Sequence, residues 1–398
     1  MMFSLFRTSL VAQFKQPIRQ GGRYWWLSIL FWIMMIAPAR AALDLRVAID
    51  DGVSQVTVGS STKAVVRDGA GQSLGELTPM QGLNATVGGG RVTLDGRWRA
   101  GQIWIEPTTG GLVWIGDRWY RGKTLLVSTP KGLTAVNYVN LEHYLYSVLG
   151  GEMNGGWPQE ALKAQAVAAR SYALYQRKSG NGVYDVGDTA AWQVYRGVND
   201  ESQGTQLAVD ATAGQVLTYN SQIIEAVFHS SSGGHTENVE DVWVQALPYL
   251  RGVPDYDQTS PVYQWEKTFS RTQLSSLISG IGNVISMTPV RTSPYGRIIT
   301  MRIFGDAGTR NISGDTLRQA LGLKSARFEV TPQYGPVASS SGSISSAPTS
   351  FRIKGRGFGH GLGLSQWGAY NLAMRGYNYQ QIVSHYYKGT ALAKMDVR

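Results

Sequence analysis

The chain has 398 residues, of which 43% are hydrophobic and 11% aromatic, so it can build a sizeable core and is not globally disordered. It has no cysteine, which excludes disulfide bonds, thiol catalysis and metal sites with Cys ligands. The net charge of +10 suits an acidic partner such as nucleic acid, anionic lipid or a wall polymer, or simply a solvated basic surface. Its 37 basic residues form no run typical of a nucleic-acid-binding arm.

The first 42 residues have the pattern of an export signal. Basic residues precede an apolar stretch at 24–37, and the small residues Ala37, Ala39 and Ala41 fit a cleavage site. The stretch is short for a membrane-spanning helix, which needs roughly 20 residues. We expect cleavage near Ala41 or Ala42, with an uncleaved membrane anchor as the alternative. Either outcome predicts a protein that is exported and is periplasmic or associated with the cell wall.

The mature chain begins with β signals and continues into a long helix. Residues 43–140 contain short β-branched runs separated by Gly, Asp and Asn turns, which predicts a β-rich N-terminal part. Residues 141–265 should form the core and contain the longest helix, from Gln159 to about Lys178. One apolar stripe indicates the buried face of that helix: Leu162, Ala166, Ala169 and Ala173.

Residues 266–330 predict a separate α/β subdomain. Two short helices are expected at 270–279 and 313–323, each beginning with a Ser cap, and a strand is expected at 297–304.

The remaining chain predicts a loop and then the completion of the core. Residues 331–350 are rich in Ser, Gly and Pro and predict a flexible loop. Residues 351–398 predict a strand, a glycine loop and two helices. The whole pattern indicates an α+β fold with a β-rich body of short strands, one long helix and a smaller α/β subdomain.

One acidic residue, Glu152, stands among four glycines directly before the long helix. Burial against Met153 and Trp157 would raise the pKa of its carboxyl group, so that it could donate a proton near neutrality. Lys163 and Arg170 are about two helical turns apart and could bind an anionic or acetamido group from one face. On these residues alone, the alternative is a first-turn acid stabilised by the helix dipole, with two solvated cations nearby.

Two histidines, His229 and His235, flank a Ser/Gly segment. A zinc site would need further ligands from Glu237, Glu240 or Asp241, and the spacing does not fit a helical His pair. The alternative is a turn that hydrogen-bonds sugar hydroxyls or itself.

A third stretch, GRGFGHGLGLSQWGA at 355–369, surrounds His360 with glycines. It lacks the Lys-Ser or Lys-Thr pair of a phosphate-binding loop. Phe358, Trp367 and Tyr370 are flat aromatic residues suited to stacking on sugar rings. The stretch predicts a glycine-lined cleft for an extended polymer, or alternatively a close-packed turn between a strand and a helix.

These stretches, in this order, resemble the SpoIID/LytB family, which comprises the stage II sporulation protein D and amidase-enhancer domain. The resemblance extends over about 43–390. It is carried by YLYSVLGGEMNGGWPQEALKAQAVAARSYAL (144–174), DTAAWQVYRG (188–197), FHSSSGGHTENVEDVW (228–243), PYLRGVPD (248–255), SGDTLRQALGLKSARFEV (313–330) and the C-terminal stretch 355–390.

The resemblance implies a lytic transglycosylase that acts on peptidoglycan glycan strands stripped of stem peptides. The family's catalytic acid falls on Glu152, which would protonate the glycosidic oxygen between N-acetylmuramic acid and N-acetylglucosamine. As a base it would then take the proton of the sugar's C6 hydroxyl, closing a 1,6-anhydro ring, so the second carboxylate of ordinary glycoside hydrolysis is not needed. The expected substrate-binding residues are Lys163, Arg170, Tyr249, Arg251, His360 and Gln366.

The resemblance also implies alternatives and absences. Some family members bind zinc through cysteines, which this chain lacks, so we expect no metal and no cofactor. A non-enzymatic wall-binding enhancer of an N-acetylmuramoyl-L-alanine amidase is the second interpretation. A metal-dependent amidase or peptidase is disfavoured by the five histidines. The expected partners are glycan strands and an amidase, with no nucleic acid and no membrane contact apart from an uncleaved anchor.

Overall fold

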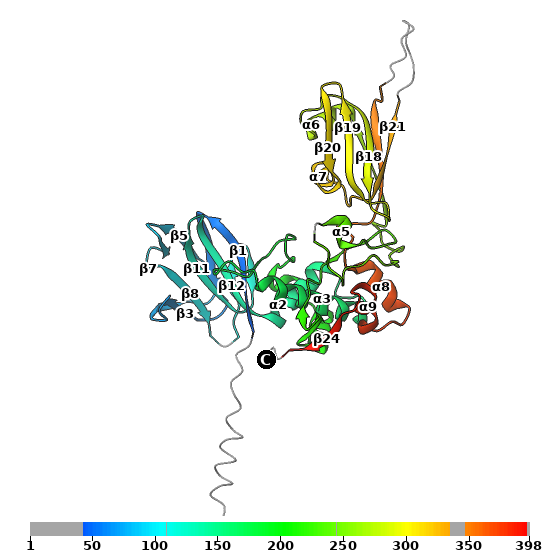
Figure 1. Ribbon diagram of the computed structural model, residues 1–398. Coiled ribbons are helices and arrows are strands. Elements are labelled where there is room, and N and C mark those ends of the chain that lie inside the picture. The colour runs from blue at the N-terminus through cyan, green and yellow to red at the C-terminus, as the bar shows by residue number, and fades with distance from the viewer. Residues whose placement is uncertain (1–42, 109, 244, 335–346, 396–398) are drawn as a thin grey trace, which may run out of the picture. The chain divides into compact units, whose positions relative to one another are not determined.

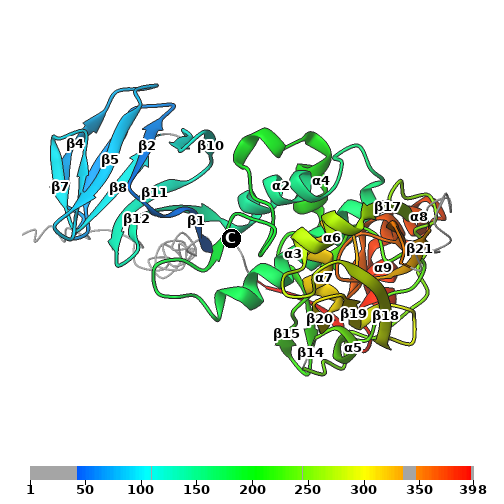
Figure 2. The same ribbon diagram turned by 90° about the horizontal axis from the view of Figure 1, so that it is seen from above.

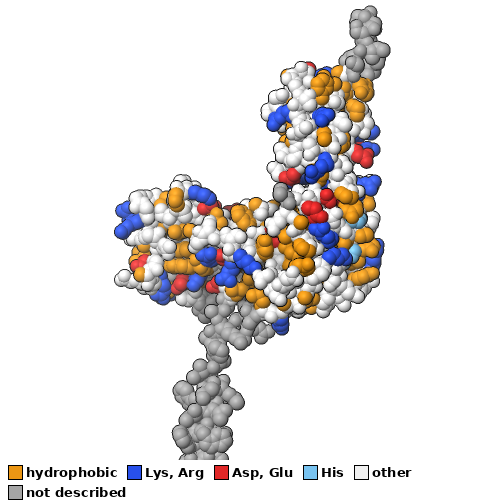
Figure 3. Space-filling view, in the orientation of Figure 1, with side chains coloured by type: hydrophobic (Ala, Val, Ile, Leu, Met, Phe, Trp, Pro, Cys, Tyr) orange, Lys and Arg blue, Asp and Glu red, His pale blue; other side chains and the backbone are white. Residues whose placement is uncertain are grey.

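A computed structural model describes residues 43–108, 110–243, 245–334 and 347–395. The predicted export signal at 1–42 therefore lies outside the described residues, as does the middle of the predicted loop at 331–350. The helices of the described part are all too short or too polar to cross a membrane. The fold is α+β and rich in strands, as predicted. Lys and Arg side chains lie in separate groups over the face shown in Figure 3 and form no continuous basic surface.

Two sheets form the N-terminal part, which is coloured blue to cyan in Figure 1, and their strands pair antiparallel except for β13 and β1. The first has the order β13-β1-β12-β11-β8-β3-β4 and the second β10-β9-β2-β5-β6-β7. Alternating buried Val, Leu and Ile residues explain why these short segments pair as strands. The strands are β1 (Asp44–Val53), β2 (Gln55–Ser60), β3 (Ala64–Asp68), β4 (Ser73–Leu77), β5 (Leu83–Gly88), β6 (Arg91–Leu94), β7 (Trp98–Ala100), β8 (Gln102–Pro107), β9 (Val113–Ile115), β10 (Arg118–Tyr120), β11 (Lys123–Thr129), β12 (Gly132–Asn140) and β13 (Val186–Gly187).

Helices α2 (Leu141–Glu152) and α3 (Gln159–Arg177) follow the sheets. The side chain of Asn140 caps α2 by accepting from the amides of Glu142 and His143. The prediction of α3 is confirmed to within one residue, and its apolar stripe is completely buried. Helix α3 packs against α2, α4 (Gln203–Ala211), α8 (Gln366–Met374) and α9 (Tyr379–Tyr386), and Figure 2 shows α2 beside α4.

Short elements connect the helical part. Strand β13 pairs in parallel with β1, which ties the segment after α3 to the N-terminal sheet. Strands β15, β14 and β24 form a small sheet, and β16 pairs in parallel with β23. The bounds are η1 (Gly197–Asp200), β14 (Gln215–Tyr219), β15 (Gln222–Ile223), β16 (Phe228–His229), α5 (Val239–Val242), β23 (Leu364–Ser365) and β24 (Ala391–Lys394).

The region after residue 263 has a hydrophobic core of its own, which includes Leu274, Met301, Leu317 and Phe351. Two three-stranded sheets, β17-β22-β21 and β18-β19-β20, enclose it. The two predicted helices and the strand between them are confirmed, and serines cap both helices as expected. The bounds are β17 (Gln264–Ser270), α6 (Arg271–Leu277), β18 (Val284–Thr292), β19 (Ile298–Gly305), β20 (Gly308–Ser313), α7 (Gly314–Ala320), β21 (Phe328–Gln333) and β22 (Ser350–Arg356).

The two ends of the predicted loop at 331–350 are strands. Strand β21 continues to Gln333, and Ser350 opposite it begins β22. Pro332 has no backbone N–H to donate. It is tolerated because β21 is an edge strand, and its open side has no neighbouring strand in the sheet that would accept a hydrogen bond. Composition alone predicted a loop here, because β21 at one end of the segment pairs with β22 at the other end, and a local pattern does not show such a partner.

Candidate active site

Glu152 is the last residue of α2, not a residue in a turn before a helix. This position corrects the sequence-based expectation. It also removes the alternative in which the carboxylate is stabilised at a helix N-terminus. The C-terminal end of a helix carries partial negative charge, so it disfavours an ionised carboxyl group.

Two glycines in the last turn of α2 are required by close packing. A Cβ atom at Gly150 would lie 1.7 Å from the carbonyl oxygen of Asp200, and one at Gly151 would lie 2.9 Å from the carbonyl oxygen of Val194. Neighbouring backbone therefore comes directly against the turn that carries Glu152. The glycines that suggested a flexible turn instead allow this contact.

The Glu152 carboxyl group is half-buried and accepts two hydrogen bonds. The backbone N–H of Val194 donates to Oε1 at 3.2 Å, and Nε2 of Gln366 donates to Oε2 at 3.1 Å. Burial raises the pKa of Glu152, and these two donors together with the charge of Arg196 limit the rise. The group is thus biased toward the protonated form, while its ionised form still has partners.

The Val194 amide is positioned by buried side chains. Tyr144 on α2 donates from its hydroxyl to Oε1 of Gln193 at 3.0 Å, and Nε2 of Gln193 donates to the carbonyl of Ala169 on α3 at 3.2 Å. The hydroxyl of Tyr195 donates to Oδ1 of Asn137 at 2.8 Å. Sequence reasoning did not identify Val194, although its segment, DTAAWQVYRG, was recognised as a family motif.

Pairing between two distant motifs brings Gln366 to Glu152. Strand β16 of the His229 motif pairs with β23, and α8 begins at Gln366 directly after β23, with Ser365 as its cap. Gln366 was predicted to bind substrate, and in the structure its amide contacts the candidate acid.

Three aromatic side chains lie next to these residues in the chain and pack together. The ring centroids of Trp157 and Trp367 are 4.8 Å apart, and Tyr370 lies 5.0 Å from Trp157 and 5.5 Å from Trp367. Each ring keeps some exposed surface. Flat aromatic faces of this kind suit the apolar faces of sugar rings.

Arg170 has no exposed surface. Its Nε and Nη2 atoms donate to the two carboxylate oxygens of Glu142 at 2.8 and 2.5 Å, and Nη1 donates to the carbonyl of Gln215 at 3.0 Å. The predicted direct contact with substrate therefore does not fit, because a completely buried guanidinium cannot reach a polymer. Arg170 instead ties α3 to α2.

Lys163 is half-buried and pairs with Glu160 at 2.7 Å, and its role in substrate positioning stays a prediction. Tyr249 is 6% exposed, and its hydroxyl accepts from the amide of Glu225 at 3.3 Å, so it does not present a face to substrate. Arg251 makes a two-pronged ion pair with Glu240 at 2.7 and 2.6 Å. Tyr249 therefore stabilises the segment around it, whereas Arg251 keeps 34% of its side chain exposed and its role in substrate binding stays a prediction.

His360 has both ring nitrogens occupied by backbone groups. Its Nε2 lies 3.0 Å from the carbonyl of Phe228, and its Nδ1 accepts from the amide of Leu362 at 3.0 Å. Burial, with smaller contributions from His229 and Arg297, lowers the pKa of His360 to about 3. It therefore stays neutral and stabilises the glycine loop, and because part of its surface is exposed, the predicted substrate contact stays a prediction.

The histidine motif does not form a metal centre in the described part of the chain. His229 is buried with Nδ1 3.0 Å from the carbonyl of Leu362, and His235 stacks on Tyr295 with centroids 3.7 Å apart. Nowhere in residues 43–108, 110–243, 245–334 and 347–395 are three His, Asp or Glu side chains arranged to hold a metal ion.

Comparisons with known proteins agree with the motifs. Residues 129–219 match the family described as Stage II sporulation protein, and residues 249–363 match a domain of unknown function, DUF8618. The first match contains Glu152 and Val194, and the second ends shortly before Gln366.

Relatives align over most of the chain. Identity is 35% over 297 residues to the Stage II sporulation protein D of Bacillus subtilis (strain 168), covering 68% of this chain and 80% of that protein. An uncharacterized protein of Brachyspira hyodysenteriae is 32% identical over 287 residues, covering 72% and 75%. The Amidase enhancer of Bacillus subtilis (strain 168) is 32% identical over 293 residues, covering 62% of this chain and 40% of that protein.

Proposed function

Because this chain belongs to the SpoIID/LytB family, we propose that it acts in cell-wall remodelling and cleaves peptidoglycan glycan strands as a lytic transglycosylase. The observation that carries the proposal is the single half-buried carboxyl group of Glu152, with its raised pKa and its two hydrogen-bond donors. The charged group that acts on it is Arg196, which is itself paired with Asp200 at 2.7 Å. A single acid that serves both proton transfers suits a reaction in which the sugar supplies its own nucleophile.

The proposed reaction uses Glu152 twice. The protonated carboxyl group donates to the glycosidic oxygen as the bond from C1 breaks and an oxocarbenium-like centre develops. The carboxylate then takes the proton of the C6 hydroxyl, whose oxygen attacks C1 and closes the 1,6-anhydro ring. Burial and the C-terminal end of α2 favour the neutral acid before the first step. The donors from Val194 and Gln366 stabilise the carboxylate between the two steps.

The aromatic cluster Trp157–Trp367–Tyr370 is the proposed platform for the sugar rings, because Trp157 lies one short turn after the acid in the chain and Trp367 directly follows Gln366. The proposed site of action is outside the cytoplasmic membrane, in the periplasm or at the cell wall, where the substrate lies.

The direct test is mass analysis of the products released from glycan strands stripped of stem peptides. The proposal expects fragments with 1,6-anhydro-muramic ends from the natural chain and none from Glu152→Gln. Products with ordinary reducing ends would instead indicate hydrolysis and refute the transglycosylase reaction.

A second function is favoured by the relative named Amidase enhancer. In that case the chain would bind the wall without cutting it and would stimulate an added N-acetylmuramoyl-L-alanine amidase. Stimulation that survives Glu152→Gln, together with unaltered glycan, would select this function over the enzymatic one.

A further inference from the structure

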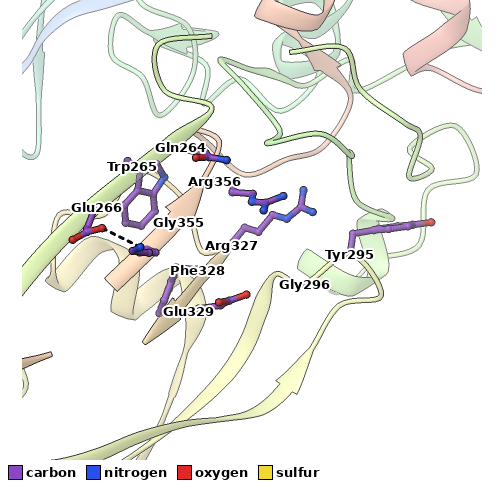
Figure 4. Close-up of a pocket in the computed structure, with 11 residues that line it drawn as sticks. Gln264, Trp265, Glu266, Tyr295, Gly296, Arg327, Phe328, Glu329, Gly355 and Arg356 are labelled. Carbon is purple, nitrogen blue, oxygen red and sulfur yellow. Dashed lines mark ion pairs between the residues drawn. The ribbon is translucent and has the colours of Figure 1, made fainter. Parts of the chain in front are cut away.

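A pocket lies within the region that matches the domain of unknown function. It has a volume of about 580 Å³ and is lined by residues of β17, β21 and β22, by Arg327 directly before β21, and by the turn at Tyr295 and Gly296. Figure 4 shows the side chains of Arg327 and Arg356 next to each other in it. The function proposed for Glu152 leaves this pocket without a role.

The charges in the pocket leave two guanidinium groups for a ligand. Lys354 pairs with Glu266 at 3.6 Å, so these two charges offset each other. Arg327 donates from Nη1 to the carbonyl of Gly233 at 2.9 Å and forms no ion pair with a described carboxylate, although its charge also acts on Glu237. Arg356 is exposed, and its side chain has no ion pair among the described residues.

The walls of the pocket are held rigidly by packing. The Trp265 ring lies against Gly355, where a Cβ atom would come within 2.1 Å of the indole, and its Nε1 donates to the carbonyl of Gly357 at 2.9 Å. Tyr295 is stacked on His235 with an angle of 17° between the ring planes. A pocket that combines fixed aromatic rings with a few converging charged groups has the usual character of a small-ligand site.

From these contacts we propose that the pocket binds a carboxylate-bearing saccharide, at a site separate from Glu152. A guanidinium fork matches a planar carboxylate with two parallel hydrogen bonds. Glu329 is the remaining carboxylate in the lining, so against two guanidinium groups the pocket has one positive charge in excess. That excess suits a singly charged carboxylate better than a doubly charged phosphate.

This inference deepens the proposed function and rests on it for the source of the ligand. In a glycan strand without stem peptides, the lactyl group of each muramic acid ends in such a carboxylate. The pocket would then recognise the strand by its acid groups, while the Glu152 site performs the cleavage.

The test uses the full chain carrying Glu152→Gln, so that no cleavage occurs during calorimetric titration. The disaccharide of N-acetylglucosamine and N-acetylmuramic acid is compared with chitobiose, which has a similar size and no carboxylate. Arg356→Ala should weaken disaccharide binding about tenfold, because it removes one charge-assisted pair, and should leave chitobiose binding unchanged. Arg291→Ala removes an exposed arginine of β18 outside the pocket lining and should change neither affinity.

Further measurements test where the disaccharide binds and which chemical group the pocket recognises. The substitution of Arg356 by alanine keeps its Cβ atom against Gly233, and Arg356→Lys, which keeps the charge and loses the fork, should give an intermediate affinity. A disaccharide with a photoreactive group should label peptides from 264–266, 295–296 or 327–329. Equal affinities in Arg356→Ala and its parent, or labelling confined to 152–157, would overturn the proposal. Inorganic phosphate that binds more tightly than the disaccharide in an Arg356-dependent way would overturn the carboxylate assignment.

These measurements distinguish a failure of the reaction proposed at Glu152 from a failure of the proposed saccharide site. If the natural chain releases no anhydro products but binding still depends on Arg356, the reaction at Glu152 is refuted and the saccharide site stands. If anhydro products appear but Arg356 has no effect on binding, only the saccharide site is refuted.

Discussion

Replacing Glu152 by glutamine separates the chemistry of this residue from its contribution to the fold. The oxygen of the new side chain can still accept from the Val194 amide. The Gln366 amide can rotate so that its oxygen accepts from the new NH₂ group. Both hydrogen bonds of 3.2 and 3.1 Å therefore have a substitute, and we expect a folded protein.

The expected loss of activity is large. A positioned general acid or base contributes about 10²–10⁴-fold to the rate, equivalent to roughly 3–5 kcal/mol of activation free energy. Because Glu152 serves both proton transfers in the proposed reaction, we expect a loss near 10⁴-fold. The rate of release of anhydro fragments from denuded glycan measures it.

Glu152→Gln should not lower the stability of the folded protein, in contrast to its effect on activity. A carboxyl group whose pKa is raised by folding weakens the folded state at pH values above its folded pKa, where it must ionise in a half-buried site. Glutamine has no charge to desolvate, so the melting temperature of Glu152→Gln at pH 7.5 should equal or exceed that of the natural chain. The difference should disappear at pH 4, where the glutamate is protonated.

Glu160 provides the matched control. Burial alone would raise the pKa of Glu160, but hydrogen bonds from Lys163 and from the Tyr379 amide lower it overall. Glu160→Gln should therefore lose some stability at neutral pH and keep its activity. Full activity in Glu152→Gln, or a lower melting temperature with activity lost only in proportion to unfolding, would refute the assignment of Glu152 as the catalytic acid.

Three other substitutions test the surroundings of the site. Gln366→Leu removes a donor to the ionised carboxyl group, so the pKa of Glu152 should rise further. The alkaline limb of the pH profile of kcat/KM should then move to higher pH, and an unmoved limb would contradict the hydrogen bond between Gln366 and Glu152. Arg170→Met leaves Glu142 without its partner and should cost about 3–5 kcal/mol in chemical denaturation with KM unchanged, whereas a raised KM at full stability would restore the substrate role. Burial raises the pKa of Asp188 to about 6, so ionisation of this group weakens the fold progressively as the pH rises toward that value. Asp188→Asn should therefore gain about 1 kcal/mol of unfolding free energy at pH 7.5, after allowance for partial exposure, and nothing at pH 4. An equal gain at both pH values would exclude this cause.

Local pattern was sufficient for features that depend on local forces. The α3 stripe, the serine caps and the alternating strands each follow from a few neighbouring residues, and they were predicted correctly. The burial of Arg170 had a signal that was not used, because this residue is four positions after Ala166 and three before Ala173, on the buried stripe itself. An arginine on such a stripe predicts a buried ion pair and not a substrate contact.

Contacts between distant segments were not predictable in this way. Val194 is 42 residues from Glu152 in sequence and Gln366 is 214 residues away. Val194 contributes its backbone N–H group, and no residue type in a sequence indicates such a donor. Gln366 reaches the carboxyl group only because β16 and β23 pair, and each of these strands is two residues long.

The glycines at the end of α2 explain both the error about this helix and the environment of its last residue. Gly150 and Gly151 each lower helix propensity by about 1 kcal/mol relative to alanine, which is why the sequence predicted a turn. In the fold they let the backbone at Asp200 and Val194 approach the last helical turn, and the Val194 amide then reaches the carboxyl group of Glu152. The same approach withdraws that carboxyl group from water and raises its pKa. The unfavourable helix residues are thus the means by which a single acid is buried, oriented and biased toward its protonated form.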